Sequence, residues 1–144
     1  MSKSNLEARD QKGLFRQTYP YIETTEELLS SDQLPSWFKY PEPLLNLVRH
    51  KNIDFGPWQI LLSKWLEVRL TGLRQRYPER NLIPFARRMD CDDVACFDVQ
   101  KQAEKPSVVI IHDFASSGWE MRSEFEDFEQ WLDTAKADAK EWGL

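Results

Sequence analysis

The chain has 144 residues, of which 41% are hydrophobic and 30% charged, and this length corresponds to one domain around one core. The formal net charge of -5 disfavours binding to the phosphate backbone of nucleic acids, and no apolar run approaches the roughly 18 residues that a membrane-spanning helix needs. The polar start of the chain lacks the apolar stretch of a secretory signal, so the sequence predicts a cytoplasmic protein.

The N-terminal part is expected to contribute little regular structure. Residues 1–20 are polar and non-periodic, which predicts a loosely ordered lead-in to a single domain at residues 21–144. Within that domain, Thr24 or Thr25 is a capping residue for a short predicted helix that ends at Leu29.

The segment that follows combines prolines, aromatic residues and short apolar runs. Three prolines within residues 34–43 exclude a regular helix there and predict extended backbone that lies over the core. Residues 44–48 and 53–61 are predicted strands, separated by a polar turn. Gly56, followed by Pro57, predicts a bend within the second of these strands.

A helical period begins at residue 62. Up to residue 77 the apolar side chains recur at intervals of three or four, which predicts an amphipathic helix. Its packing stripe is expected to consist of Leu62, Trp65, Leu66, Leu70, Leu73 and Tyr77. Its solvated face is expected to carry Lys64, Glu67, Arg69, Arg74 and Arg76. Gly72 costs such a helix about 1 kcal/mol relative to alanine, which indicates a close contact at this position.

Three apolar runs, at residues 82–86, 94–99 and 108–112, predict the core of a β-sheet. Because the last run is continuously apolar, we expect that strand to be covered on both faces. At least one face of the sheet therefore needs a layer of helices.

A final helix is predicted at residues 123–142, where Ser123 and Glu126 match a capping box. Its packing stripe is expected to consist of Phe125, Phe128, Trp131, Leu132, Ala135 and Ala139. Together the elements predict a single α+β domain in which a mixed or mostly antiparallel sheet packs against helices.

Charge is distributed unevenly along the chain. Residues 49–88 carry nine basic and three acidic side chains, whereas residues 89–144 carry five basic and 14 acidic ones. An acidic surface attracts basic partners, which favours a protein partner over nucleic acid. The alternative is that the acidic helix faces only keep the protein soluble.

The densest charge cluster is the turn that contains Asp90, Asp92 and Asp93 between two predicted strands. A calcium loop would need more oxygen ligands and a glycine, and the spacing of Cys91 and Cys96 is not that of a zinc knuckle. We therefore predict neither a metal nor a cofactor. The turn is interpreted as an inter-strand connection whose carboxylates cap backbone N–H groups, which is compatible with protein recognition.

His112 and Asp113 form the one pair that is typical of acid–base catalysis. Neighbouring residues of a strand face opposite ways, and no nucleophile stands in a G-x-S-x-G motif, so a structural histidine is preferred and no enzyme is predicted. A small hydrolase that uses Asp92, Asp93 and His112 is the third hypothesis; it requires these groups to converge in a deep pocket.

Trp119 follows a short segment of serines and glycine, and two placements remain open for its ring. The ring either folds back onto the core or is presented to a partner, and tryptophan is enriched at interface hot spots. The candidate protein-binding residues are Asp90, Asp92, Asp93, Asp113 and Trp119.

Four features follow one another in a characteristic order: the sequence IPFA at residues 83–86, DDVACFD at 92–98, a buried strand, and the F-x-x-F-x-x-W-L pattern at 125–132. In this order they resemble the SUKH superfamily, which includes Smi/Knr-type proteins, and the similarity is clearest over residues 52–132. The resemblance implies an α+β domain without enzymatic chemistry.

Members of that superfamily commonly act as immunity proteins that neutralise bacterial toxins, many of them nucleases, by direct binding. The resemblance thus implies a protein partner, such as a basic toxin domain, while hydropathy and charge predict no membrane and no nucleic-acid ligand. The alternative that it leaves open is an intracellular regulatory or scaffold module.

Overall fold

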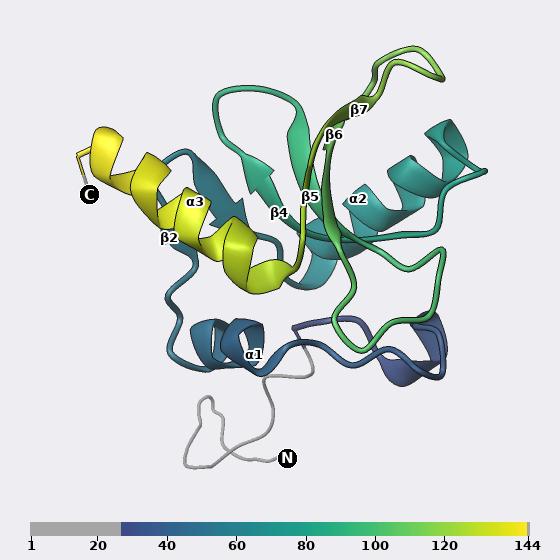
Figure 1. The fold of residues 1–144 in the computed structure, drawn as a ribbon, viewed down its shortest axis with the longest axis horizontal. Coiled ribbons are helices and arrows are strands. Elements are labelled where there is room, and N and C mark those ends of the chain that lie inside the picture. The colour runs from purple at the N-terminus through teal and green to yellow at the C-terminus, as the bar shows by residue number, and fades with distance from the viewer. Residues whose placement is uncertain (1–26, 144) are drawn as a thin grey trace.

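The computed structural model describes residues 27–143, which build one six-stranded antiparallel sheet with helices on both faces (Figure 1). The helical elements are η2 (Ser31–Gln33), α1 (Glu42–Arg49), α2 (Ser63–Arg76) and α3 (Phe128–Glu141). The strands are β2 (Asp54–Phe55), β3 (Trp58–Ile60), β4 (Leu82–Arg88), β5 (Asp93–Asp98), β6 (Val108–His112) and β7 (Met121–Phe125). The predicted α+β fold is confirmed. The predicted lead-in at 1–20 and the capping threonines lie outside the described residues.

The sheet is a meander, because its spatial order β2-β3-β4-β5-β6-β7 equals the chain order. Val94 pairs with Ile111 and thus shares one face with it, while Ala95 pairs with Ile110 on the other face. All four side chains are buried, which confirms that β6 is covered on both faces. The cover comes from α2 on one side and α3 on the other (Figure 1). No helix within residues 27–143 is long and apolar enough to cross a membrane.

The core on the α3 side is aromatic. The ring of Phe85 lies with its centroid 4.6 Å from that of Phe97 and 4.8 Å from that of Trp131. Phe38 packs 5.3 Å from Phe97, so the proline-rich segment lies over the core, as its composition predicts. These contacts join the N-terminal segment, the sheet and α3 into one core.

The prediction of a strand at residues 44–48 is wrong, since these residues belong to α1. Leu44 and Val48 are buried while Asn46 between them is exposed, and a strand would place all three on one face, so the burial follows the helical period. Pro43 is also favourable in the first turn of the helix. Proline has no backbone N–H, and the N–H groups of the first turn have no acceptor within the helix. A run this short does not distinguish the two periods. The prediction of a short helix ending at Leu29 is also wrong where the structure describes it, because residues 27–29 are not helical.

The predicted start of the final helix at Ser123 is also wrong. Ser123 lies in β7 and pairs with Ile110, and α3 begins after Asp127, whose carboxylate accepts a hydrogen bond from the Gln130 N–H at 2.9 Å. β7 is an edge strand with mostly exposed side chains, so it carries no apolar alternation that marks it in the sequence. The packing stripe from Phe128 onward is confirmed, with Trp131 buried at its centre.

A single glycine permits the close approach of the β2–β3 turn to α3. Gly56 has a φ of 68°, and a Cβ at this position would lie 2.7 Å from the Cα of Ala139. We expect Gly56→Ala to lower the free energy of unfolding by about 3 kcal/mol, because the left-handed backbone and the clash both oppose a side chain. Urea unfolding measures this loss.

The matched control is Gly118→Ala. Gly118 also has a positive φ, of 97°, but no atom lies within 4 Å of a Cβ added there. It should therefore lose only about 1 kcal/mol, the cost of the backbone conformation. Equal losses in the two variants would contradict the close contact between Gly56 and α3.

Candidate functional site

The connection between β6 and β7, residues 113–120, is here named the aromatic loop. It carries two buried acidic residues, Asp113 at 1% exposure and Glu120 at 6%, each followed or preceded by an exposed aromatic side chain. Phe114 is 62% exposed and Trp119 is 81% exposed. Of the two placements considered for Trp119, the structure shows the exposed one. The loop therefore presents two large rings next to its two fixed ends.

Asp113 fixes the first end of the aromatic loop. One carboxylate oxygen accepts from Arg69 at 2.7 Å, and Arg76 donates to both oxygens at 2.7 and 2.8 Å. Burial by itself raises the pKa of Asp113, but the hydrogen bonds from Arg76 and Arg69 outweigh it and hold the pKa below its ordinary value. Asp113, predicted as a contact residue, is thus buried against these two arginines, and its contact with a partner stays a prediction.

Glu120 fixes the second end in the same manner. Its carboxylate accepts from the Arg80 guanidinium and from the Gly118 N–H, both at 2.7 Å. Desolvation raises the pKa of Glu120, while the Arg80 hydrogen bond and those from the backbone lower it, and the net pKa lies below the usual range. Between the ends, the Tyr77 hydroxyl donates to the Ala115 carbonyl at 2.8 Å. The loop is therefore held at three points.

Phe114 adopts a backbone conformation that bulky residues rarely take, with a φ of 70°. Two contacts hold it there: its N–H donates to Asp113 at 2.9 Å, and the Arg76 guanidinium carbon lies 4.0 Å from the ring centroid. Strained backbone that is held by its surroundings clusters at functional sites. The Phe114 ring is exposed although phenylalanine side chains are usually buried in the core.

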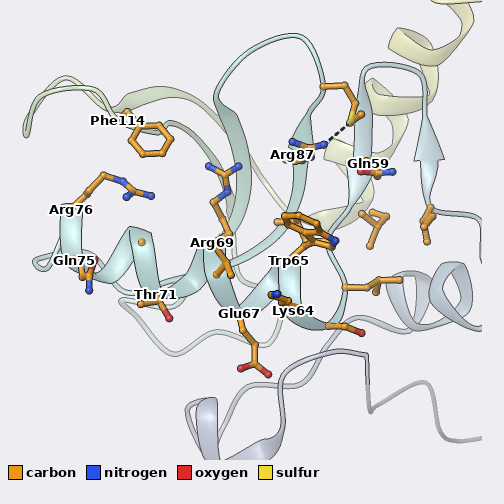
Figure 2. A pocket seen from close by; sticks show the side chains of 18 residues that line it. Gln59, Lys64, Trp65, Glu67, Arg69, Thr71, Gln75, Arg76, Arg87 and Phe114 are labelled. Atoms are coloured by element: carbon orange, nitrogen blue, oxygen red, sulfur yellow. Dashed lines mark hydrogen bonds between the residues drawn. The ribbon is translucent and has the colours of Figure 1, made fainter.

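Phe114 also ends an open groove of about 1530 Å³ that follows α2 (Figure 2). We name it the α2 groove. Besides α2 and Phe114, it is lined by Ile53, by residues 59–62 and by Arg87 and Met89. The apolar side chains exposed along it are Trp65, Val68, Met89 and Phe114.

The prediction that Trp65 packs in the core is wrong, because its side chain is 73% exposed. Leu66, Leu70 and Leu73 face the sheet, and Trp65 stands one residue, about 100°, away from that stripe. Trp65 instead begins a second stripe at helical spacing, which continues through Arg69, Gly72 and Arg76.

Gly72 gives the Arg76 side chain of this second stripe the space to reach Asp113. A Cβ at Gly72 would overlap the guanidinium of Arg76, so the glycine lets the arginine lie back along the helix toward Asp113. The close contact predicted at Gly72 is confirmed. Arg69 and Arg76 were expected only as a solvated face; two arginines with a glycine between them are the signal in the sequence for this ion-pair cluster.

The acidic turn lies between β4 and β5, as predicted. Asp90 accepts from Arg88 at 2.8 and 3.0 Å, and the hydrogen bond from Arg88 is the main reason that the pKa of Asp90 lies below its ordinary value. The Asp93 carboxylate lies 2.9 Å from His112 Nδ1. Asp92 is exposed. Neighbouring basic side chains thus contact two of the three aspartates, and their contact with a partner stays a prediction.

His112 and Asp113 face opposite sides of the sheet, as the strand geometry predicts. The register places His112 opposite Asp93, and Arg122 lies 3.6 Å from the same carboxylate. Neither the α2 groove nor the smaller pocket beside Arg80 is lined by these residues. Within residues 27–143, no group of three or more His, Cys, Asp and Glu side chains is placed to hold a metal ion.

The two thiols are poor nucleophiles. Cys96 is fully buried, and this burial raises its pKa strongly. Cys91 is exposed, yet partial desolvation, followed by the charges of Asp93 and Asp90, raises its pKa as well. Both thiols are therefore protonated at neutral pH.

The chain is an α+β domain in which a meander sheet lies between helices. The ends of its aromatic loop are held by ion pairs to α2 and to Arg80. The model of the SMI1/KNR4 family (SUKH-1) matches residues 16–134, and the chain belongs to this family. No curated protein and no solved structure matches the chain. The resemblance stated from the sequence is thereby confirmed, and membership is consistent with a non-enzymatic binding role.

Proposed function

We propose that the chain is a non-enzymatic, cytoplasmic immunity protein that neutralises a toxin by binding it directly through the aromatic loop. The observation that carries this proposal is the exposure of Phe114 and Trp119 on a loop whose two ends are held by Asp113 and Glu120. Aromatic side chains dominate interface hot spots. A loop already held in place loses little conformational entropy on binding, which favours tight association.

The charge of the chain supports a basic partner, such as a nuclease domain. The net charge of -5 is concentrated after residue 89, and opposite charge speeds the encounter of two proteins. Because Arg88 and His112 contact two of the aspartates in the acidic turn, we assign to Asp90, Asp92 and Asp93 a contribution to the association rate. The main contact energy is assigned to the aromatic loop.

The second candidate function is an intracellular regulatory or scaffold module. The α2 groove favours it, because grooves along helices accept peptide segments of partner proteins. The two candidates differ in what happens to the partner: an immunity protein abolishes the partner's activity, whereas a scaffold leaves it intact.

The test begins with capture of the partner from the cells that naturally produce this protein, with the full chain as bait. The enzymatic activity of the purified partner is then assayed with and without the chain. We expect its enzymatic activity, with nuclease activity assayed first, to fall to zero at one equivalent of the chain. A partner whose activity is unchanged at saturating chain would contradict toxin neutralisation and support the scaffold function.

We expect Trp119→Ala to weaken binding of that partner at least tenfold, because a largely exposed tryptophan on a fixed loop is the strongest hot-spot candidate. The free energy of unfolding should change by less than about 0.5 kcal/mol, since the ring contacts solvent. Calorimetric titration and urea unfolding measure the two effects.

Trp142→Ala is the matched control, since Trp142 is an exposed tryptophan at the end of α3. This variant should bind with unchanged affinity. If Trp119→Ala binds as tightly as Trp142→Ala, the aromatic loop is not the contact surface.

A further inference from the structure

We infer that the α2 groove is the docking site for a locally acidic peptide segment, carrying apolar side chains, of a partner whose surface is otherwise basic. The inference deepens the proposed function, on which it rests, because it names the chemistry of a segment that the bound protein inserts. It concerns a surface that extends along α2 and that the aromatic loop reaches only with Phe114 (Figure 2).

The groove is long enough to accommodate a short extended peptide. Trp65 and Arg76 lie at its two ends along α2, which places them about 16 Å apart at 1.5 Å per residue (Figure 2). This length accommodates roughly five extended residues. Exposed Trp65 and Val68 line one part of it and exposed Phe114 the other, so apolar side chains of a ligand find contacts along the whole length.

The charge of the lining is opposite to that of the chain as a whole. Four cationic side chains line the groove against one anionic side chain: Lys64, Arg69, Arg76 and Arg87 against Glu67. Asp113 compensates one positive charge of the Arg69 and Arg76 pair, and a net positive charge remains. An acidic ligand is therefore attracted to this surface although the chain carries -5.

The arginines have donors to offer to carboxylates. Arg87 donates to the sulfur of Met89 at 3.2 Å, a weak acceptor that a carboxylate replaces with a gain in energy. Among residues 27–143, Arg69 donates to Asp113 through one terminal nitrogen, and no other residue of that range accepts from its remaining N–H groups. Because Asp113 fixes both Arg69 and Arg76, these donors are positioned before a ligand arrives.

A separate partner fits this charge better than the chain itself. Residues 1–26 carry four basic and four acidic side chains, so that segment as a whole has no net charge. In a second copy, the acidic turn would offer Asp90 and Asp93, which Arg88 and His112 already contact. The structure therefore favours an acidic segment from another protein.

The test uses the full chain and three synthetic peptides of about 12 residues with identical leucine and phenylalanine positions. The remaining positions are filled with aspartate and glutamate, with glutamine, or with lysine. We expect the acidic peptide to bind at least tenfold more tightly than the glutamine peptide at low salt and to lose this advantage at about 1 M salt, where charges are screened. Equal binding of the lysine and acidic peptides, or no binding of the acidic peptide, would overturn the inference.

Two variants locate the site, each with a matched control. Trp65→Ala and Arg87→Gln should each weaken the acidic peptide about fivefold or more. Trp142→Ala and Lys136→Gln change an exposed tryptophan and an exposed cation elsewhere and should leave the affinity unchanged. If the groove variants bind like their controls, the peptide lies elsewhere and the inference is wrong.

The failure of this inference is distinguishable from failure of the proposed function. If the captured partner is lost with Trp119→Ala but kept with Trp65→Ala, the aromatic loop is the contact surface and the groove is not. Analytical ultracentrifugation tests whether a second copy of the chain occupies the groove. A dimer of the wild-type chain that dissociates in Trp65→Ala would assign the groove to a second copy and overturn the inference.

Discussion

Trp131→Ala should lower the free energy of unfolding by about 3–5 kcal/mol. The ring is almost completely buried, and its centroid lies 4.8 Å from that of Phe85 and 5.5 Å from that of Trp58. The ring thus joins α3 to β4 and β3. Its removal leaves a cavity, because these three elements cannot move together to fill the space. Urea unfolding measures the loss, and a loss below about 1 kcal/mol would contradict the central role of this ring in the core.

Trp131→Phe separates the packing of the ring from its polar atom. The Nε1 of Trp131 is buried without a hydrogen-bond partner among the described residues, so phenylalanine removes an unpaired donor while it keeps an aromatic ring. We expect a smaller loss, of about 1–2 kcal/mol. Trp142→Ala, at the exposed end of the same helix, should lose less than about 1 kcal/mol.

Asp113→Asn should lower the free energy of unfolding by about 3 kcal/mol at neutral pH, because it removes the charge that holds Arg69 and Arg76. The arginines are partly exposed, so water replaces part of the lost interaction. Asp90→Asn is the control: its ion pair with Arg88 is exposed and should contribute less than about 1 kcal/mol. Equal losses would contradict the role of Asp113 as an anchor.

The same pair gives a defined pH dependence. The pKa of Asp113 in the folded chain lies below its value of 3.8 in the unfolded chain. Its contribution is therefore fully present above the unfolded pKa and is lost as pH falls through the folded pKa. Wild-type stability should decline below about pH 4, and Asp113→Asn should show a shallower acid limb in urea unfolding. Parallel acid limbs would mean that Asp113 is not ion-paired in the folded chain.

Asp113→Asn should also affect binding by the aromatic loop. Asp113 accepts the Phe114 N–H and positions Arg76, which in turn lies over the Phe114 ring. Asparagine keeps an oxygen that can accept the Phe114 N–H but lacks the charge and the second acceptor that hold Arg76, so the support for the left-handed backbone at Phe114 is weakened. A variant with lower stability and unchanged partner affinity would show that the anchor serves the fold alone.

Part of the site was accessible from the sequence and part was not. The loop with Trp119 and the acidic turn were identified because short polar segments between apolar runs indicate exposed connections. The roles of Asp113 and Trp65 were not. A buried ion pair between α2 and the end of β6 joins residues 37 and 44 positions apart in the chain, and no local pattern reports such a pairing.

The sequence by itself determined the elements whose burial repeats with a local period. The strands predicted at 82–86, 94–99 and 108–112 correspond to β4, β5 and β6, the helix predicted at 62–77 corresponds to α2, and the packing stripe of α3 was predicted from Phe128 onward. It also determined the family, because its motifs lie in these core elements. Tertiary structure alone decided that residues 44–48 form a helix, that residues 121–125 pair as an edge strand, and that Trp65 is exposed. These outcomes depend on which surface each segment meets, since propensity and periodicity in a short run are weaker than burial against a particular neighbour.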